Sequence, residues 1–172
     1  MKKLLLIYLL IITFSCAKAQ NETKLNEETT TYYLIRHAEK DKSDATNKDP
    51  NLIEKGLDRA EKWSNHFKNI DLDAIYSTNY NRTMATASPT ATNQELEITP
   101  YSPNTLDIKT FLDETKNQTV LIVGHSNTTP AFVNKILGEE KYESIDEAIN
   151  SKLFIVTINS ENKINSKVIE VD

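Results

Sequence analysis

Short apolar runs alternate along the chain with amphipathic segments, and this alternation is the main indicator of the fold. Three apolar runs are typical of buried strands: 31–36, 72–76 and 119–124. Three segments carry apolar residues at helical spacing: 54–67, 82–90 and 105–115. A regular alternation of strand and helix favours a mostly parallel sheet with helices on both faces. The pattern therefore predicts an α/β fold, a three-layer sandwich.

Single residues predict where several helices begin and end. The helix at 82–90 is expected to stop near Pro89, because proline lacks the N–H that a helix interior needs. Thr129 followed by Pro130 predicts the start of a further helix, with Thr129 as its N-cap. Gly138 predicts the end of that helix in a left-handed conformation. Three weaker runs are expected to be strands, the last two as a hairpin or an edge pair: 95–99, 152–159 and 163–171.

The first residues form a segment of a different kind. Two lysines, the apolar run Leu4–Phe14 and the small residues after it are typical of an export signal. The run is short for a bilayer span, which disfavours an uncleaved anchor helix. We expect 1–19 to be the export signal, 20–30 a polar tether, and 31–172 a single domain.

The maturation of this signal has two interpretations, and both stay open. The sequence Ala17-Lys18-Ala19 is a small-residue cleavage site that leaves Gln20 as the first residue. Alternatively, the run that ends at Cys16 resembles a loose bacterial lipobox, and Cys16 would then be lipidated. Either route predicts an exported bacterial protein, periplasmic or held at a membrane only through a lipid on Cys16.

Composition excludes several classes of function. The formal net charge is −5 and no cluster of lysine and arginine is present, which argues against nucleic acid as a partner. Cys16 is the only cysteine, so the domain has neither a disulfide nor a cysteine-based metal site. The chain has three glycines, at 56, 124 and 138, too few and too far apart for a glycine-rich phosphate loop.

Four candidate catalytic side chains follow the predicted strands. Arg36 and His37 directly follow the first strand, and His125 directly follows the 119–124 strand. Arg82 opens the helix after the second strand. The carboxyl ends of parallel strands meet at one edge of a sheet, where α/β proteins place their ligand sites. We therefore expect two guanidinium groups and two imidazoles in one pocket.

Such a pocket suits phosphoryl transfer. One guanidinium group can donate two parallel hydrogen bonds to two oxygens of a phosphate, and a neutral imidazole can attack phosphorus. The alternative chemical role of His37 and His125 is to bind a metal ion. It is disfavoured because both histidines come with arginines rather than with carboxylates or cysteines at ligand spacing. No metal and no cofactor are predicted. A surface arginine paired with an acidic residue is the alternative interpretation of Arg82.

Three motifs in this order resemble the histidine phosphatase superfamily, the phosphoglycerate-mutase-like group named for its Arg-His pair. They are Leu34–Lys40, Tyr76–Ala87 and Val123–Pro130, with a weaker Leu52…Gly56…Ala60 pattern between the first two. The likeness covers nearly the whole chain from Thr31 to about Thr157. In size the chain is similar to the small bacterial phosphohistidine phosphatases. Ala38 stands where the family commonly has glycine, and Ile53 where it has threonine or serine.

The resemblance implies a role for each candidate residue. His37 would be the nucleophile that forms a phosphohistidine, and Arg36, Arg82 and His125 would form the phosphate pocket around a small phosphorylated substrate. Ser77 and Asn127 would either contact phosphate or cap helices. Glu39 and Lys40 are expected to be a solvated charged pair.

The proton donor is the weak point of the likeness. Many members carry an acidic residue in an insertion between the second arginine and the second histidine, and here that interval is short. Asp107, at a predicted helix start, is the best candidate donor. Without a donor, a catalytically idle member that binds a phosphorylated ligand or an envelope partner is the alternative function. The sequence predicts neither the physiological substrate nor the oligomeric state.

Overall fold

A computed structural model describes residues 28–171 of the chain. The six strands are β1 (Thr30–Arg36), β2 (Ala74–Thr78), β3 (Ile98–Tyr101), β4 (Thr119–Gly124), β5 (Lys152–Ile158) and β6 (Ile164–Glu170). The four helices are α1 (Glu54–Phe67), α2 (Asn81–Gln94), α3 (Ile108–Glu114) and α4 (Thr128–Leu137). The predicted export signal and most of the predicted tether lie outside the described residues. Within 28–171, no helix is long and apolar enough to cross a membrane.

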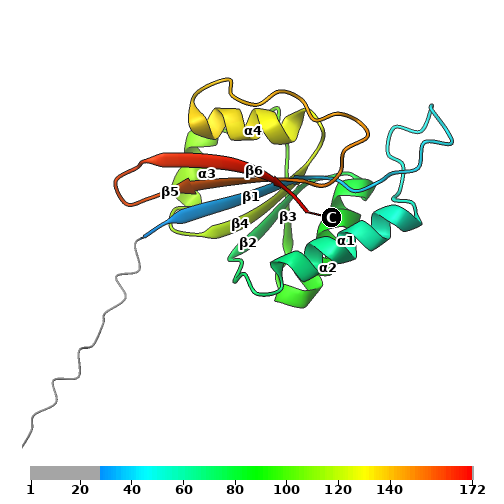
Figure 1. Ribbon diagram of the computed structural model, residues 1–172, viewed down its shortest axis with the longest axis horizontal. Helices are drawn as coiled ribbons and strands as arrows, with labels where there is room; N and C mark the ends of the chain where they lie inside the picture. Colours follow the sequence, from blue (N-terminus) through cyan, green and yellow to red (C-terminus); the bar gives the residue numbers. More distant parts are fainter. Residues whose placement is uncertain (1–27, 172) are drawn as a thin grey trace, which may run out of the picture.

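All six strands form one sheet in the order β3-β2-β4-β1-β5-β6 (Figure 1). The first four in this order are parallel to one another, whereas β5 and β6 run antiparallel to their neighbours. β5 and β6 form the hairpin predicted at the end of the chain. The mostly parallel sheet of the sequence prediction is therefore confirmed.

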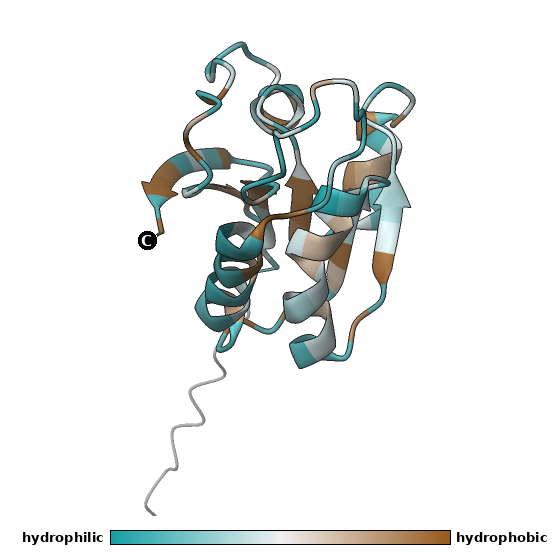
Figure 2. Ribbon diagram, turned by 90° about the vertical axis from the view of Figure 1, so that its right-hand side faces the viewer, coloured by the Kyte–Doolittle hydropathy of each residue, from teal (hydrophilic) through white to brown (hydrophobic). Residues whose placement is uncertain are grey.

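Helices cover both faces of the sheet, as predicted. Adjacent residues of one strand point to opposite faces, so Leu34 packs with Phe132 of α4 while Ile35 packs with Trp63 of α1. α1 and α2 cover one face, and α3 and α4 cover the other. Figure 2 shows brown, apolar strand segments beside helices that are coloured teal, white or pale brown along their length. The two cores make the three-layer sandwich.

The expectation that the second helix stops near Pro89 is wrong, because α2 continues to Gln94. Proline removes one helical hydrogen bond, but Ala87 and Ala91 on either side of it are buried against the core. The Gln94 side chain also donates to the backbone oxygens of Phe67 and Ile70. Packing and these end contacts outweigh the lost bond.

The start of α4 also differs from the prediction. Asn127, not Thr129, takes the N-cap position, and its side chain makes no capping hydrogen bond. Thr129 is buried in the first turn, where its hydroxyl donates to the backbone oxygen of Ile35. The threonine therefore ties α4 to β1 instead of capping it. Gly138 does end the helix in the left-handed conformation, with φ 70°.

The connections around β1 and β4 create the place for a site. β1 and β4 are neighbours, yet the helix after β1 packs on one face and the helix after β4 on the other. A crevice opens at the carboxyl ends of two parallel strands whose connections diverge in this way.

Candidate active site

The strand register brings the two predicted histidines together. Arg36 is paired with Gly124, so the next residue of each strand is a histidine. The ring centroids of His37 and His125 lie 5.5 Å apart, with the rings at 67° to each other. Gly124 is needed here because a Cβ would lie 2.8 Å from the Thr129 hydroxyl. The close fit between β4 and α4 thus sets the position of His125.

His37 is held with one ring nitrogen engaged. Its Nδ1 lies 2.8 Å from the backbone oxygen of Ala38, which assigns the proton to Nδ1 and leaves the Nε2 lone pair free. The side chain of Asn150 donates to the His37 backbone oxygen, 2.8 Å away. Burial, with smaller effects from Arg36, His125 and Arg82, lowers the pKa of His37 to about 3. The ring is therefore neutral at pH 7.

His125 lies between the first turn of α2 and the end of β2. Its Nε2 is 3.0 Å from the Thr78 hydroxyl, and its Nδ1 is 3.4 Å from a guanidinium nitrogen of Arg82. The edge of its ring meets Tyr80, with centroids 5.0 Å apart. Burial and the charge of Arg82 lower the pKa of His125 to about 4.

Arg36 is buried and bound to the loop before β5. Its guanidinium donates to the backbone oxygens of Asp146 and Ile149 and to the Glu147 carboxylate, the last at 2.7 Å. Its Nε has no hydrogen-bond partner among the described residues. A buried N–H without a partner is costly, and a phosphate oxygen would satisfy it.

Arg82 is buried at the start of α2. From the sequence it was expected either in the phosphate pocket or in an ion pair with an acidic residue, and its contacts fit both. It pairs with Asp49 at 3.3 Å, and it also reaches His125. Both contacts are long for hydrogen bonds, and its Nε is unpartnered within residues 28–171. Its guanidinium is therefore available to an anion at low cost.

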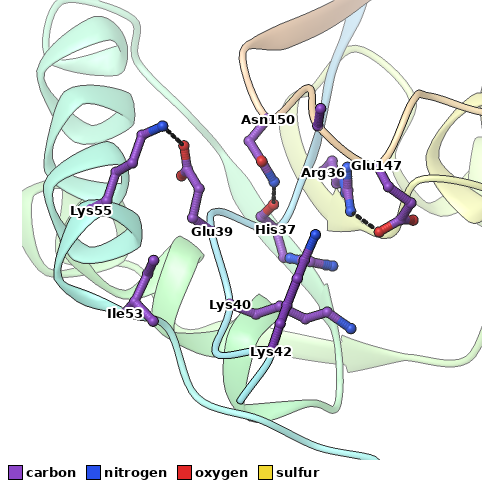
Figure 3. Close-up of a pocket in the computed structure, with 10 residues that line it drawn as sticks. Arg36, His37, Glu39, Lys40, Lys42, Ile53, Lys55, Glu147 and Asn150 are labelled. Carbon is purple, nitrogen blue, oxygen red and sulfur yellow. Dashed lines mark hydrogen bonds and ion pairs between the residues drawn. The ribbon is translucent and has the colours of Figure 1, made fainter. Parts of the chain in front are cut away.

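A cavity of about 350 Å³ opens beside His37 (Figure 3). Arg36, His37 and Glu147 line its inner part, and Lys40, Lys42 and Lys55 line its rim. The predicted solvated pair of Glu39 and Lys40 is not what the structure shows. Burial opposes ionisation of Glu39, but hydrogen bonds from Arg59 and nearby cations keep the pKa of its carboxyl below the usual value.

Three other predicted site residues lie elsewhere. Asp107 caps α3, where its carboxylate accepts from the Thr110 N–H, and it borders a depression with Tyr76 and Pro100. Ser77 is fully buried and its hydroxyl donates to the Thr78 backbone. Asn127 is exposed at the start of α4 and borders a third depression. No hydrogen bond among residues 28–171 joins any of these three side chains to His37 or His125.

Three site residues were missed from the sequence: Thr78, Glu147 and Asn150. Glu147 and Asn150 come from the loop before β5, which has no periodic pattern, and their contacts with β1 span more than a hundred positions. No local signal indicates such contacts. Thr78 follows an apolar run at the sheet edge, so its position could have been found. Among residues 28–171, no three histidine, cysteine or acidic side chains are placed to hold a metal ion.

The model of the histidine phosphatase superfamily (branch 1) matches residues 32–102. This stretch holds Arg36, His37 and Arg82, so the likeness predicted from the motifs is confirmed there. No curated protein sequence matches the chain.

Solved structures share the fold at low sequence identity. A protein from Escherichia coli K-12, a candidate alpha-ribazole-5'-phosphate phosphatase, matches with a TM-score of 0.66 at 13% identity, over 82% of this chain and 96% of that one. Phosphoglycerate mutase from Bacillus anthracis matches with a TM-score of 0.63 at 12% identity, over 82% and 92%. The protein histidine phosphatase SixA, solved with tungstate, matches with a TM-score of 0.63 at 13% identity, over 81% and 96%.

Proposed function

We propose that the chain is a histidine-type phosphatase, which hydrolyses a phosphomonoester or phosphoramidate through a phosphohistidine on His37. The match of the histidine phosphatase model to residues 32–102 supports this proposal. The observation that carries this proposal is the state of the His37 ring. Its Nδ1–H is held by the Ala38 oxygen, so Nε2 carries the lone pair, and the charges of two buried arginines, Arg36 and Arg82, act on the ring.

Two steps follow from this arrangement. In the first, Nε2 attacks phosphorus, the bond to the leaving oxygen or nitrogen breaks, and the leaving group departs with the electron pair. In the second, water attacks the phosphohistidine, releases inorganic phosphate and regenerates His37. The unpartnered Nε–H groups of Arg36 and Arg82 are suited to stabilise charge on the transferring oxygens.

The leaving group sets the limits of this reaction. A general acid should hold a proton at working pH, but both carboxylates that line the cavity favour the ionised form. A hydrogen bond from Ser126, together with the charge of Arg36, lowers the pKa of Glu147. Burial raises the pKa of Glu39, but hydrogen bonds from Arg59 and nearby cations bring it below its usual value. We therefore propose substrates whose leaving group needs no proton from the protein, such as aryl phosphates or phosphoramidates already protonated on nitrogen by solvent.

The first test is turnover of p-nitrophenyl phosphate by the purified protein, with and without a chelator. We expect turnover in both conditions and a loss of at least about a thousandfold in the His37→Ala variant, because the covalent route requires the ring. Asn65→Ala, on the exposed side of α1, is the matched control and should keep full activity. Equal turnover in the wild type and the His37→Ala variant would contradict the mechanism.

A second test varies the leaving group. Across aryl phosphates of rising phenol pKa, we expect kcat/KM to fall steeply, because no proton reaches the leaving oxygen in the transition state. Single-turnover rates measured over such a series give the slope. A flat series would show that a donor exists, and Asp107→Asn would then ask whether that donor is Asp107.

A protein that binds phosphate but turns over no substrate would favour the second candidate function, an idle binding protein of the envelope. Export itself stays a proposal that rests on the segment Leu4–Phe14 and on Cys16. Incorporation of labelled lipid, abolished by Cys16→Ser, would decide between the two routes of maturation.

A further inference from the structure

The proposed reaction uses none of the three lysines on the rim of the cavity, and Lys55 is the one among them that pairs with a carboxylate. Lys40 and Lys42 extend from the segment after β1 into the cavity that holds His37 (Figure 3). Neither ammonium group has a carboxylate partner within 4.0 Å among residues 28–171. The chain as a whole has a net charge of −5, whereas these two lysines place positive charge at the opening of the cavity.

The acidic groups of the cavity are already neutralised by other cations. Glu39 pairs with Arg59 at 2.9 Å and with Lys55 at 3.5 Å. Glu147 pairs with Arg36 at 2.7 Å. Because both carboxylates are already paired, the charges of Lys40 and Lys42 give the opening a net positive charge.

The backbone position of Lys40 is fixed. Lys40 forms an isolated antiparallel bridge with Leu52, closed by hydrogen bonds of Asp41 N to Asn51 O and of Ile53 N to Glu39 O. The lysine stem therefore starts from a set point at the cavity wall, and its charge acts on both His125 and Glu147. A fixed backbone at this position removes one part of the conformational freedom that would otherwise be lost when the ammonium binds an anion.

We propose that Lys40 and Lys42 form a second anion subsite, and that the substrate carries a carboxylate or a second phosphate beside the phosphoryl group attacked by His37. This inference rests on the proposed phosphatase function and narrows its substrate to a class. The cavity of about 350 Å³ has room for a small molecule that spans both positions.

The test measures binding without turnover. Three phosphonates serve as probes: benzylphosphonate, 4-(phosphonomethyl)benzoate and p-xylylenediphosphonate. Calorimetry with the purified wild type should show one or both of the probes with a second anionic group binding about tenfold more tightly than benzylphosphonate, as expected for charge contacts that solvent partly screens. Which of the two gains more distinguishes a carboxylate from a second phosphate.

Variants assign this preference to the rim. In Lys40→Met with Lys42→Met, the preference should fall to about twofold or less, and added salt should reduce it in the wild type. Lys109→Met with Lys116→Met removes the same charge from two exposed lysines outside the cavity, and should keep the preference. Thermal unfolding of each variant shows that it is folded.

Three outcomes would overturn the subsite. They are a wild type without preference, an equal loss in both double variants, and an equal loss of affinity for all three probes in the rim variant. A protein that binds none of the probes would overturn the phosphate pocket together with the subsite. Binding without preference would overturn the subsite alone, and turnover of p-nitrophenyl phosphate remains a separate measurement.

Discussion

A histidine that acts as a nucleophile must be unprotonated, and the burial of His37 provides this state over a wide pH range. Water cannot easily stabilise an imidazolium at this position, and Arg36 and Arg82 add like charge nearby. The Ala38 oxygen favours the protonated ring, but burial has the larger effect. The site therefore selects the reactive form of the ring before any substrate arrives.

This state can be measured directly. We expect the C2–H resonances of His37 and His125 in the ligand-free protein to stay at their neutral shifts from pH 7.5 down to about 5, because their pKa values lie near 3 and 4. NMR titration of the labelled rings checks this, with His37→Gln and His125→Gln used to assign the signals. A midpoint near 6.5 for either ring would contradict it.

At the scale of residues, adjacency in the sequence decides what could be predicted. Arg36, His37 and His125 follow apolar runs, so their meeting at the sheet edge could be inferred from strand pairing alone. The contacts of Glu147 with Arg36, and of Asn150 with His37, depend on how an aperiodic loop returns to β1. The position of Asp107 at a helix start was predicted, but not that its carboxylate is engaged as the cap of α3, where it accepts from the Thr110 N–H.

At the scale of elements, the first turn of α1 lies directly against the backbone of the site segment. A Cβ added at Gly56 would overlap the backbone oxygen and carbon of Glu39. Glycine is needed there for close approach, since its helical backbone conformation is open to any residue. The contact fixes the segment that runs from His37 to Lys40.

Gly56→Ala should therefore act against helix propensity. Alanine in place of glycine usually stabilises a helix interior by about 0.5–1 kcal/mol, but here we expect a loss of about 1–3 kcal/mol from overpacking. Urea unfolding measures the difference. Asn65→Ala on the same helix, where nothing crowds the side chain, should raise the free energy of unfolding slightly. If Gly56→Ala stabilises the protein, the backbone at Glu39 can move away to make room for the added Cβ.

Helices and strands were predicted well where the apolar pattern of the sequence already marks the face that is buried. The periodicity of α1 matches its bounds because Trp63 and Phe67 face a core that the sequence already implies. The end of α2 was misjudged because the packing around Pro89 is a tertiary effect. At Pro89, burial of the neighbouring helix residues stabilises α2 more than the proline destabilises it.

At the scale of the whole molecule, the histidines couple stability to pH. The unfolded chain takes up protons on histidine near pH 6.5, whereas the folded protein takes them up only near pH 3 to 4 at His37 and His125. Between these limits the unfolded chain binds more protons. Acid therefore favours unfolding.

The free energy of unfolding should fall as the pH drops from 7 to 5, with a limiting slope of about 1.4 kcal/mol per pH unit for each such histidine. Urea unfolding at several pH values gives this slope. His37→Gln should show a shallower slope than the wild type, with His66 and His125 accounting for the remainder. A free energy that rises on acidification in this window would rule out neutral buried histidines.

The central place of β1 has a consequence for how the chain is made. β1 is synthesised before every other strand, yet it pairs with β4 and β5, which lie in the last third of the chain. Folding must wait for long-range pairing, which is slow and leaves an apolar strand exposed in the meantime. A nascent chain that stops just before Asn150 already carries Arg36, His37, Arg82 and His125, but it lacks the strand that closes the sheet around them. All four candidate side chains are therefore synthesised before β5, the strand that completes the pairing of β1.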